Sequence, residues 1–141
     1  MSVVVPDASV ILKWVIPDPT GEDDLGAALR LRDAAIAGKI RILVPTLWLY
    51  ETANTLTRRF PEHAADALRL LIEFDMDAGD WTRPWLDRAV ALTRRYGVTF
   101  YDAAYHALAL VNKGVFVTAD RKYALKAGQA GGVTALREWR T

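Results

Sequence analysis

Cysteine is absent from the 141-residue sequence, and histidine occurs only twice, as His63 and His106. Without cysteine the chain cannot form a disulfide framework, a thiolate metal site or a cysteine nucleophile. Two histidines are too few for a histidine-rich zinc site. Any metal site in this chain is therefore expected to use oxygen ligands.

Long apolar runs are absent too. No stretch of roughly 18 uncharged apolar residues occurs, which excludes a transmembrane helix. At the N-terminus, an apolar run of only Val3 to Val5 precedes Pro6, with no basic residue before it, so we expect no signal peptide. The prediction is a cytoplasmic protein that does not contact membranes.

An excess of one charge is missing as well, because 18 lysines and arginines stand against 17 aspartates and glutamates. A net charge of +1 gives no overall attraction to nucleic acid, so any such contact must be local. Hydrophobic residues make up 52% of the chain, enough to bury a core and to exclude disorder. The length predicts one domain over residues 1–141.

Charges are nevertheless uneven along the chain. Residues 62–87 contain seven acidic and two basic residues, whereas residues 113–141 contain six basic and two acidic ones. Two solvated faces would explain this pattern. A basic lip for a polyanion in the last quarter of the chain is the alternative.

Short β-branched segments alternate with segments of helical spacing, which predicts an α/β fold: a parallel sheet covered by helices on both faces. The expected strands are residues 3–5, 41–45, 115–118 and 133–135. The expected helices are residues 8–15, 21–37, 46–60, 61–76, 84–96, 102–112 and 120–127. Thr46 is expected to cap the third helix, Pro61 to open the fourth and Gly97 to end the fifth.

Three aspartates, Asp7, Asp102 and Asp120, lie where strands end or helices begin. The carboxyl ends of parallel strands gather at one edge of a sheet, where ligands bind, so the three side chains could converge there. Helix capping is the alternative for each, because aspartate is a favoured N-cap residue. Thr99 and Thr118 offer other caps nearby, which weakens that alternative.

Glu51 lies inside the predicted helix 46–60 and shares one face of it with Asn54 and Arg58. Leu49 and Leu56 belong to another face, which is the expected core side. Glu51 is therefore either a solvated residue near Arg58 or a fourth carboxylate that points into the acidic cluster.

Four carboxylates in one pocket repel one another, and one or more would stay protonated without a positive partner. A divalent cation resolves the repulsion, and oxygen ligands without nearby histidine or cysteine suit Mg²⁺ or Mn²⁺. The chemistry that follows is hydrolysis of a phosphate ester, in which the metal acidifies a water and neutralises the phosphate.

Four motifs occur in order: V-V-V-P-D-A-S-V-I-L from residue 3, E-T-A-N-T-L from residue 51, F-Y-D-A-A-Y-H-A-L-A from residue 100 and V-T-A-D-R-K from residue 117. Together they resemble the PIN-domain ribonucleases, and the length and spacing resemble the VapC toxins of type II toxin–antitoxin pairs. The resemblance implies a single PIN-like domain with three α/β/α layers and a Mg²⁺- or Mn²⁺-dependent endoribonuclease activity.

Carried over by position, the resemblance makes Asp7, Glu51, Asp102 and Asp120 the catalytic acids. It makes Asp7 and Asp102 direct metal ligands, and it places Glu51 and Asp120 behind a water or at a second metal. The polar residues expected to support these acids are Ser9, Asn54 and Thr118.

The resemblance also implies in-line attack by a metal-bound water, with 5′-phosphate and 3′-hydroxyl products. It further implies a homodimer and a small antitoxin whose tail covers the site, for which the acidic helix 62–77 is a candidate contact. RNA phosphates are expected on basic residues near the acids, namely Arg58, Arg121, Lys122 and Lys126.

Neither the two histidines nor the five tryptophans are expected to take part in the chemistry. His63 is expected in solvent, and His106 on a helix surface or at an interface rather than as a proton shuttle. The five tryptophans are expected in the core or at interfaces rather than under RNA bases. Trp14 is the candidate for a partner groove.

Two other enzyme or signalling classes lack residues that they require in this sequence. A haloacid-dehalogenase-type enzyme needs a second aspartate two residues after Asp7, where this chain has Ser9. A receiver domain needs an acid pair after its first strand, which is missing. A non-catalytic PIN-like binding module and a PIN nuclease with a housekeeping role in RNA processing stay open. A binding module should gain no stability from Mg²⁺ or Mn²⁺.

Overall fold

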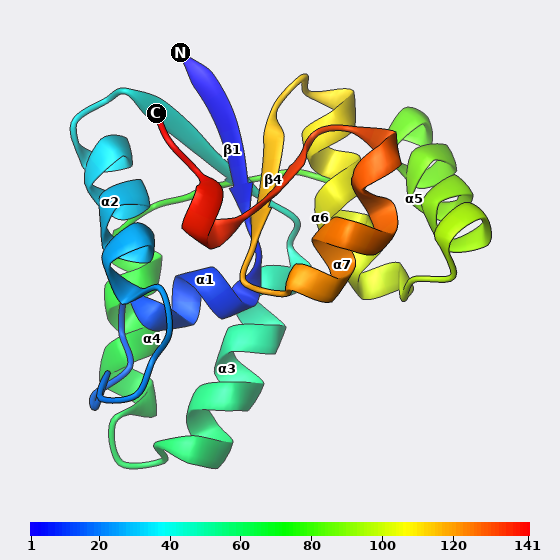
Figure 1. Ribbon diagram of the computed structural model, residues 1–141. Helices are drawn as coiled ribbons and strands as arrows, with labels where there is room; N and C mark the ends of the chain where they lie inside the picture. The colour runs from blue at the N-terminus through cyan, green and yellow to red at the C-terminus, as the bar shows by residue number, and fades with distance from the viewer.

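The five strands form one parallel sheet in the order β3-β2-β1-β4-β5 in the computed structural model, which describes all 141 residues (Figure 1). The strands are β1 (Ser2–Pro6), β2 (Ile40–Val44), β3 (Asp77–Ala78), β4 (Val115–Thr118) and β5 (Val133–Ala135). β1 lies at the centre, between β2 and β4. Because Pro6 is paired with Val117, the carboxyl ends of β1 and β4 lie side by side.

Seven α-helices surround this sheet (Figure 1). They are α1 (Ala8–Lys13), α2 (Leu25–Ile36), α3 (Leu47–Arg59), α4 (Ala64–Glu73), α5 (Arg83–Tyr96), α6 (Phe100–Val111) and α7 (Arg121–Ala127). α6 packs against β1, β2 and β4 with α5 outside it, and α2 packs against β2 from the other face. The predicted three-layer α/β/α fold is confirmed. None of the helices has the length and apolarity that a membrane span requires.

The core centres on α6 and the middle strands. α6 is buried without interruption from Ala103 to Ala109, because it lies between the sheet and α5. Its alanines allow a close approach to the sheet, and the rings of Tyr105 and Phe116 stack there with centroids 5.9 Å apart. This packing fixes α6, and with it the first turn that carries Asp102, against β1 and β4.

The predicted elements are found with somewhat different ends, and β3 is an additional strand that the sequence did not predict. β3 has only two residues, both exposed, and no β-branched side chain, so it carries no strand signal. α4 begins at Ala64, so Pro61 lies in the preceding turn rather than in the first helical turn. α2 begins at Leu25, after a loop that includes Gly21 with a positive φ of 85°.

At three other helix ends, the predicted cap bond of Thr46 is absent, the predicted start of α6 is too late and the predicted stop of α5 is confirmed. The Thr46 side chain makes no cap bond; its hydroxyl donates to the Asp80 carboxylate at 2.6 Å. α6 does not begin at Asp102, because the Thr99 side chain caps it and accepts from the Asp102 N–H. Gly97 ends α5 in the left-handed conformation, with a φ of 64°.

Candidate active site

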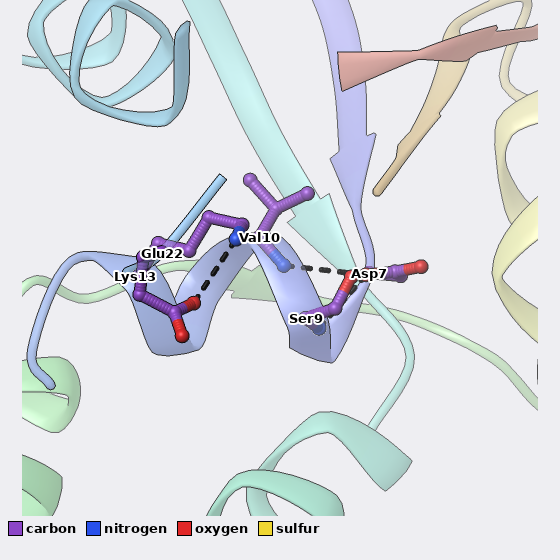
Figure 2. A network of polar contacts seen from close by, with 5 residues as sticks. All are labelled: Asp7, Ser9, Val10, Lys13 and Glu22. Atoms are coloured by element: carbon purple, nitrogen blue, oxygen red, sulfur yellow. Dashed lines mark hydrogen bonds and ion pairs between the residues drawn. The ribbon is translucent and has the colours of Figure 1, made fainter. Parts of the chain in front are cut away.

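Asp7 joins the end of β1 to the start of α1 and is only 8% exposed. Its N–H donates to the Val117 carbonyl oxygen of β4 at 3.0 Å. Oδ1 accepts from the Ser9 N–H at 2.8 Å, from the Ser9 hydroxyl and from the Val10 N–H (Figure 2). Oδ2 accepts from the Thr118 hydroxyl. The carboxylate is therefore held in one orientation where β1 and β4 end.

Burial governs the protonation of Asp7. Removal from water raises the pKa of the Asp7 carboxyl, and the hydrogen bonds from Ser9, Thr118 and the main-chain N–H groups oppose the rise without cancelling it. Keeping Asp7 ionised at this buried position therefore costs free energy, and a nearby positive charge would lower that cost.

Glu51 reaches the same place from the second turn of α3. Its Oε1 accepts a hydrogen bond of 2.6 Å from the Tyr105 hydroxyl of α6. Burial raises the pKa of the Glu51 carboxyl most, the Tyr105 bond lowers it, and the charges of Asp7 and Asp102 raise it further. The carboxylates of Asp7, Glu51 and Asp102 thus lie near enough to repel one another.

Asp102 and Asp120 are positioned by the first turns of α6 and α7. The Asp102 N–H donates to the Thr99 hydroxyl at 3.2 Å. Burial raises the pKa of the Asp102 carboxyl, the hydrogen bond that the Thr99 hydroxyl donates to Asp102 Oδ2 at 3.3 Å opposes the rise, and the charge of Asp120 adds to it. Asp120 caps α7, since its Oδ1 accepts from the N–H groups of Lys122 at 3.0 Å and Tyr123 at 3.2 Å. Its side chain is exposed, unlike that of Asp7.

The four acids line one pocket of about 200 Å³. No lysine, arginine or histidine is among the residues that line it, which are Asp7, Ala8, Ser9, Glu51, Asp102, Tyr105 and Asp120. The convergence expected from the strand ends is found. Capping is found as well, because Asp7 caps α1 and Asp120 caps α7. Asp7 and Asp120 therefore both cap a helix and line the shared pocket.

The chemistry of this pocket fits a hard divalent cation. No three His, Cys, Asp or Glu side chains are grouped tightly enough to form a ready-made coordination shell. The side chains of the lining nevertheless offer only oxygen ligands, carboxylates and hydroxyls. Burial raises the pKa of Asp7, Glu51 and Asp102, and repulsion from neighbouring carboxylates raises it further at Glu51 and Asp102. The side chains placed to hold such an ion are Asp7, Glu51, Asp102 and Asp120.

The predicted supporting residues are placed unequally. Ser9 and Thr118 both donate to Asp7. Asn54 and Arg58 are exposed on α3 and do not line the pocket. Each further turn of α3 lies about 5.4 Å farther along the helix axis, and α3 extends away from the sheet edge beyond Glu51 (Figure 1). Neither residue lies among the acids in this structure, and their supporting and RNA-binding roles stay predictions.

The three basic residues of α7 that were predicted to contact RNA lie in different places. Arg121 and Lys122 line a second cavity, of about 780 Å³, which shares Asp120 with the acid pocket. Lys126 lies away from both cavities, because its Nζ donates to the Gly97 carbonyl oxygen after α5 at 3.3 Å. Only the first turn of α7 adjoins the acids.

Tyr105 is the pocket residue that sequence reasoning missed. It lies three residues after Asp102, so the shared face of α6 was the available signal. Burial, and next the bond to Glu51, raise the pKa of the Tyr105 hydroxyl far above its usual value. The hydroxyl therefore stays protonated and remains a donor to Glu51.

His106 and two tryptophans differ from their expected surroundings. His106 is fully buried rather than at a surface, with Nδ1 2.8 Å from the Tyr123 hydroxyl and Nε2 2.7 Å from the Gly131 carbonyl oxygen. Burial lowers the pKa of its ring. Trp14 donates to the Ala28 carbonyl oxygen at 2.8 Å, so its indole is engaged within the chain. Trp81 is 85% exposed.

The sequence matches the family model of the PIN domain over residues 4–129. No curated protein matches it significantly.

The fold is similar to several solved structures. One is a toxin–antitoxin complex from Klebsiella pneumoniae, with 15% identity, a TM-score of 0.66 and coverage of 96% of this chain and 99% of that one. Another is PAE2754 from Pyrobaculum aerophilum, with 24% identity, a TM-score of 0.66 and coverage of 96% and 92%. A third is VapC20 from Mycobacterium tuberculosis, a sarcin–ricin-loop-cleaving toxin, with 20% identity, a TM-score of 0.65 and coverage of 92% and 96%. At these identities the likeness demonstrates a shared fold.

Proposed function

The chain belongs to the PIN domain family, and from this premise we propose that it is a Mg²⁺- or Mn²⁺-dependent endoribonuclease. The observation that carries the proposal is the pocket where Asp7, Glu51, Asp102 and Asp120 converge without a basic side chain. Such a pocket attracts a cation, and a cation between carboxylates is the usual means by which a protein brings a phosphodiester to an acidic site.

The residues of the chain take distinct roles in this proposal. Asp7 and Asp102 are the direct ligands, and the bonds from Ser9 and Thr118 keep Asp7 in one orientation. Glu51 and Asp120 complete the site through water or at a second metal. A bound cation supplies the positive charge that the pocket lacks and makes a water nucleophilic toward the phosphorus. In-line attack would leave a 5′-phosphate and a 3′-hydroxyl.

Two further side chains prepare this site. Tyr105 keeps the Glu51 carboxylate turned toward α6 through the 2.6 Å bond. Arg121 and Lys122, at the start of α7, supply local positive charge for the RNA backbone beside Asp120. The nearly neutral chain thus meets a polyanion with a local basic surface.

We further infer that the protein is the toxin of a toxin–antitoxin pair, acts in the cytoplasm as a homodimer and is neutralised by a cognate antitoxin. Support comes from the similar structures, which are described as a toxin–antitoxin complex and as a toxin that cleaves the sarcin–ricin loop. α4, which lies within the acidic stretch 62–77, presents Leu70 and Ile72 to solvent, as a surface for a protein partner does.

The test uses the chain purified without a partner and incubated with a mixed RNA pool and Mn²⁺. Parallel samples contain a chelator or the Asp102→Asn variant. Cleavage that disappears in both parallel samples supports the proposal.

The same samples are examined by thermal unfolding. An ion bound only to the folded state at 100 times its Kd stabilises it by about 2.7 kcal/mol. Absence of cleavage together with an unchanged Tm in Mn²⁺ would contradict the proposal and favour a non-catalytic PIN-like binding module. Cleavage of one cellular precursor at a defined site, without growth arrest on expression, would favour a housekeeping role in RNA processing.

A further inference from the structure

α1 carries a single charged residue, Lys13, among apolar neighbours. Lys13 is only 9% exposed, and its Nζ lies 3.0 Å from Glu22 Oε1 (Figure 2). Lysine is seldom buried unless it is paired, and here the partner comes from the loop between α1 and α2. The cation therefore depends on a loop carboxylate for its neutralisation.

Lys13 also faces the second cavity. That cavity, of about 780 Å³, is lined by residues of the loop after α1 and by residues at the start of α7. Its basic lining residues are Lys13, Arg121 and Lys122. Ser9, which lines the acid pocket, lies one helical turn before Lys13, so α1 leads from one cavity to the other.

We propose that this cavity binds the RNA backbone phosphate next to the scissile one, and that Lys13 contacts this phosphate by releasing Glu22. The inference rests on the proposed ribonuclease function and adds a substrate subsite to it. A strand whose scissile phosphate lies among the acids has this cavity, with its three basic side chains, directly beside it, because Asp120 belongs to both linings.

Glu22 competes with the phosphate for Lys13. The loop of residues 17–24 contains four acidic and no basic residues. Three of those acids line the cavity: Glu22, Asp23 and Asp24. Their charge repels phosphate, so RNA gains this contact only by replacing the carboxylate on Lys13. Neutralising Glu22 should consequently tighten RNA binding.

The experiment measures binding of a fluorescent single-stranded RNA oligonucleotide to the Asp102→Asn protein in Mg²⁺, over a series of salt concentrations. Each lost phosphate contact lowers the slope of log affinity against log salt by about 0.7 for single strands. Lys13→Met should reduce the slope by that amount and weaken binding about tenfold. Lys13→Arg should preserve the slope, and Glu22→Gln should tighten binding.

Lys39→Met is the matched control, because Lys39 is exposed just before β2, at the end of the sheet away from the acids. It should change neither slope nor affinity. An unchanged slope in Lys13→Met, with its Tm maintained, would overturn the subsite while the parent protein still binds RNA. Unchanged binding by Glu22→Gln would overturn the exchange even if Lys13→Met unfolds. Failure of the unmodified chain to cleave RNA, together with an unchanged Tm in Mn²⁺, overturns the proposed function instead.

Discussion

Asp7 and Asp120 are built alike and behave differently. Each follows a parallel strand, caps a short helix and accepts two main-chain N–H groups through Oδ1. Asp7 ends the central strand β1 and is buried, so the pKa of its carboxyl is raised. Asp120 follows β4 and is exposed. The same local motif thus yields a desolvated acid in one place and an ordinary cap in the other, depending on its position in the sheet.

Thr118 links the two acids. Its hydroxyl donates to Asp7 Oδ2 and accepts from the Asp120 N–H at 3.0 Å. Thr118 is buried at the end of β4, so it has no water to replace either bond. One side chain therefore sets the orientation of the buried acid and the position of the exposed one.

The largest effect is expected from Asp7→Asn. Loss of an orienting residue behind a metal ligand typically costs about ten- to a hundredfold, so loss of the proposed ligand itself should exceed that range. RNA cleavage in Mn²⁺, measured as an initial rate against the unmodified protein, tests this. If the initial rate of the variant stays within tenfold of that of the unmodified protein, Asp7 is not a catalytic residue.

The same variant also tests the burial of the charge without metal. The pKa of the folded Asp7 carboxyl lies above 3.8, so the protonated acid is the form that the folded state favours. Protonated Asp7 therefore adds to the stability of the folded state at pH values below the unfolded-state pKa. This contribution is lost as the pH rises through the folded-state pKa. Asp7→Asn should therefore raise the Tm near pH 7 in chelator and leave it unchanged near pH 3. A lower Tm at pH 7 would contradict the expectation.

Thr118→Val should affect both acids at once. It removes a donor from Asp7 and an acceptor from Asp120, and a buried group left unpaired costs about 1–3 kcal/mol. Cleavage should fall by about ten- to a hundredfold, as for other residues that orient a ligand. Urea unfolding and initial rates measure the two effects. Thr134→Val, on neighbouring β5, is the control, and an equal loss there would show that any strand threonine matters as much.

Tyr105→Phe should change the pH dependence more than the stability. The Tyr105 hydroxyl lowers the pKa of Glu51, so its removal raises that pKa and keeps Glu51 protonated to higher pH. The acidic limb of the rate–pH profile should move to higher pH, with a loss of about three- to tenfold on that limb that recovers above it. Tyr50→Phe alters an exposed tyrosine beside Glu51 and should leave the profile in place. A uniform loss at every pH would contradict the assigned role.

The smallest effect concerns Asp120 as a cap. Asp120→Ala removes the side-chain acceptor for two N–H groups of α7 and should lower the free energy of unfolding by about 1 kcal/mol. Asp120→Asn keeps that acceptor, so its stability should stay near that of the unmodified chain. Unfolding in urea compares the two, and equal losses would mean that the charge, not the cap, stabilises α7.

Much of the acid site could be predicted because strand ends and turn residues have local signals. Asp7 and Asp120 each closely follow a β-branched strand, and a parallel sheet brings the carboxyl ends of its strands to one edge. Glu51 needed the motif resemblance, since its helix spacing alone also fits a solvated residue. The start of α6 was misplaced because two residues three apart, Thr99 and Asp102, both suit an N-cap, and in the structure the Thr99 side chain makes the cap bond.

The residues that escaped prediction depend on contacts between distant segments. Tyr105 has the pattern of a core aromatic, and its role arises only where α3 brings Glu51 within 2.6 Å. Lys13 acquires its partner from the course of a loop, which no periodicity describes. Lys126 was expected near the acids because it follows Asp120 closely in the sequence. Helix α7 carries it away from the pocket, and its Nζ donates to the Gly97 carbonyl oxygen instead.

The hydrogen bond between Thr118 and Asp7 joins positions separated by 111 residues of chain. The acid pocket likewise draws its lining from the starts of α1 and α7 and from α3 and α6, so it cannot exist before β4 has paired with β1. A ribosome that has translated only as far as α6 therefore holds a nascent chain without this pocket. The active site is among the last features to form during synthesis, and it is lost whenever β4 separates from the sheet.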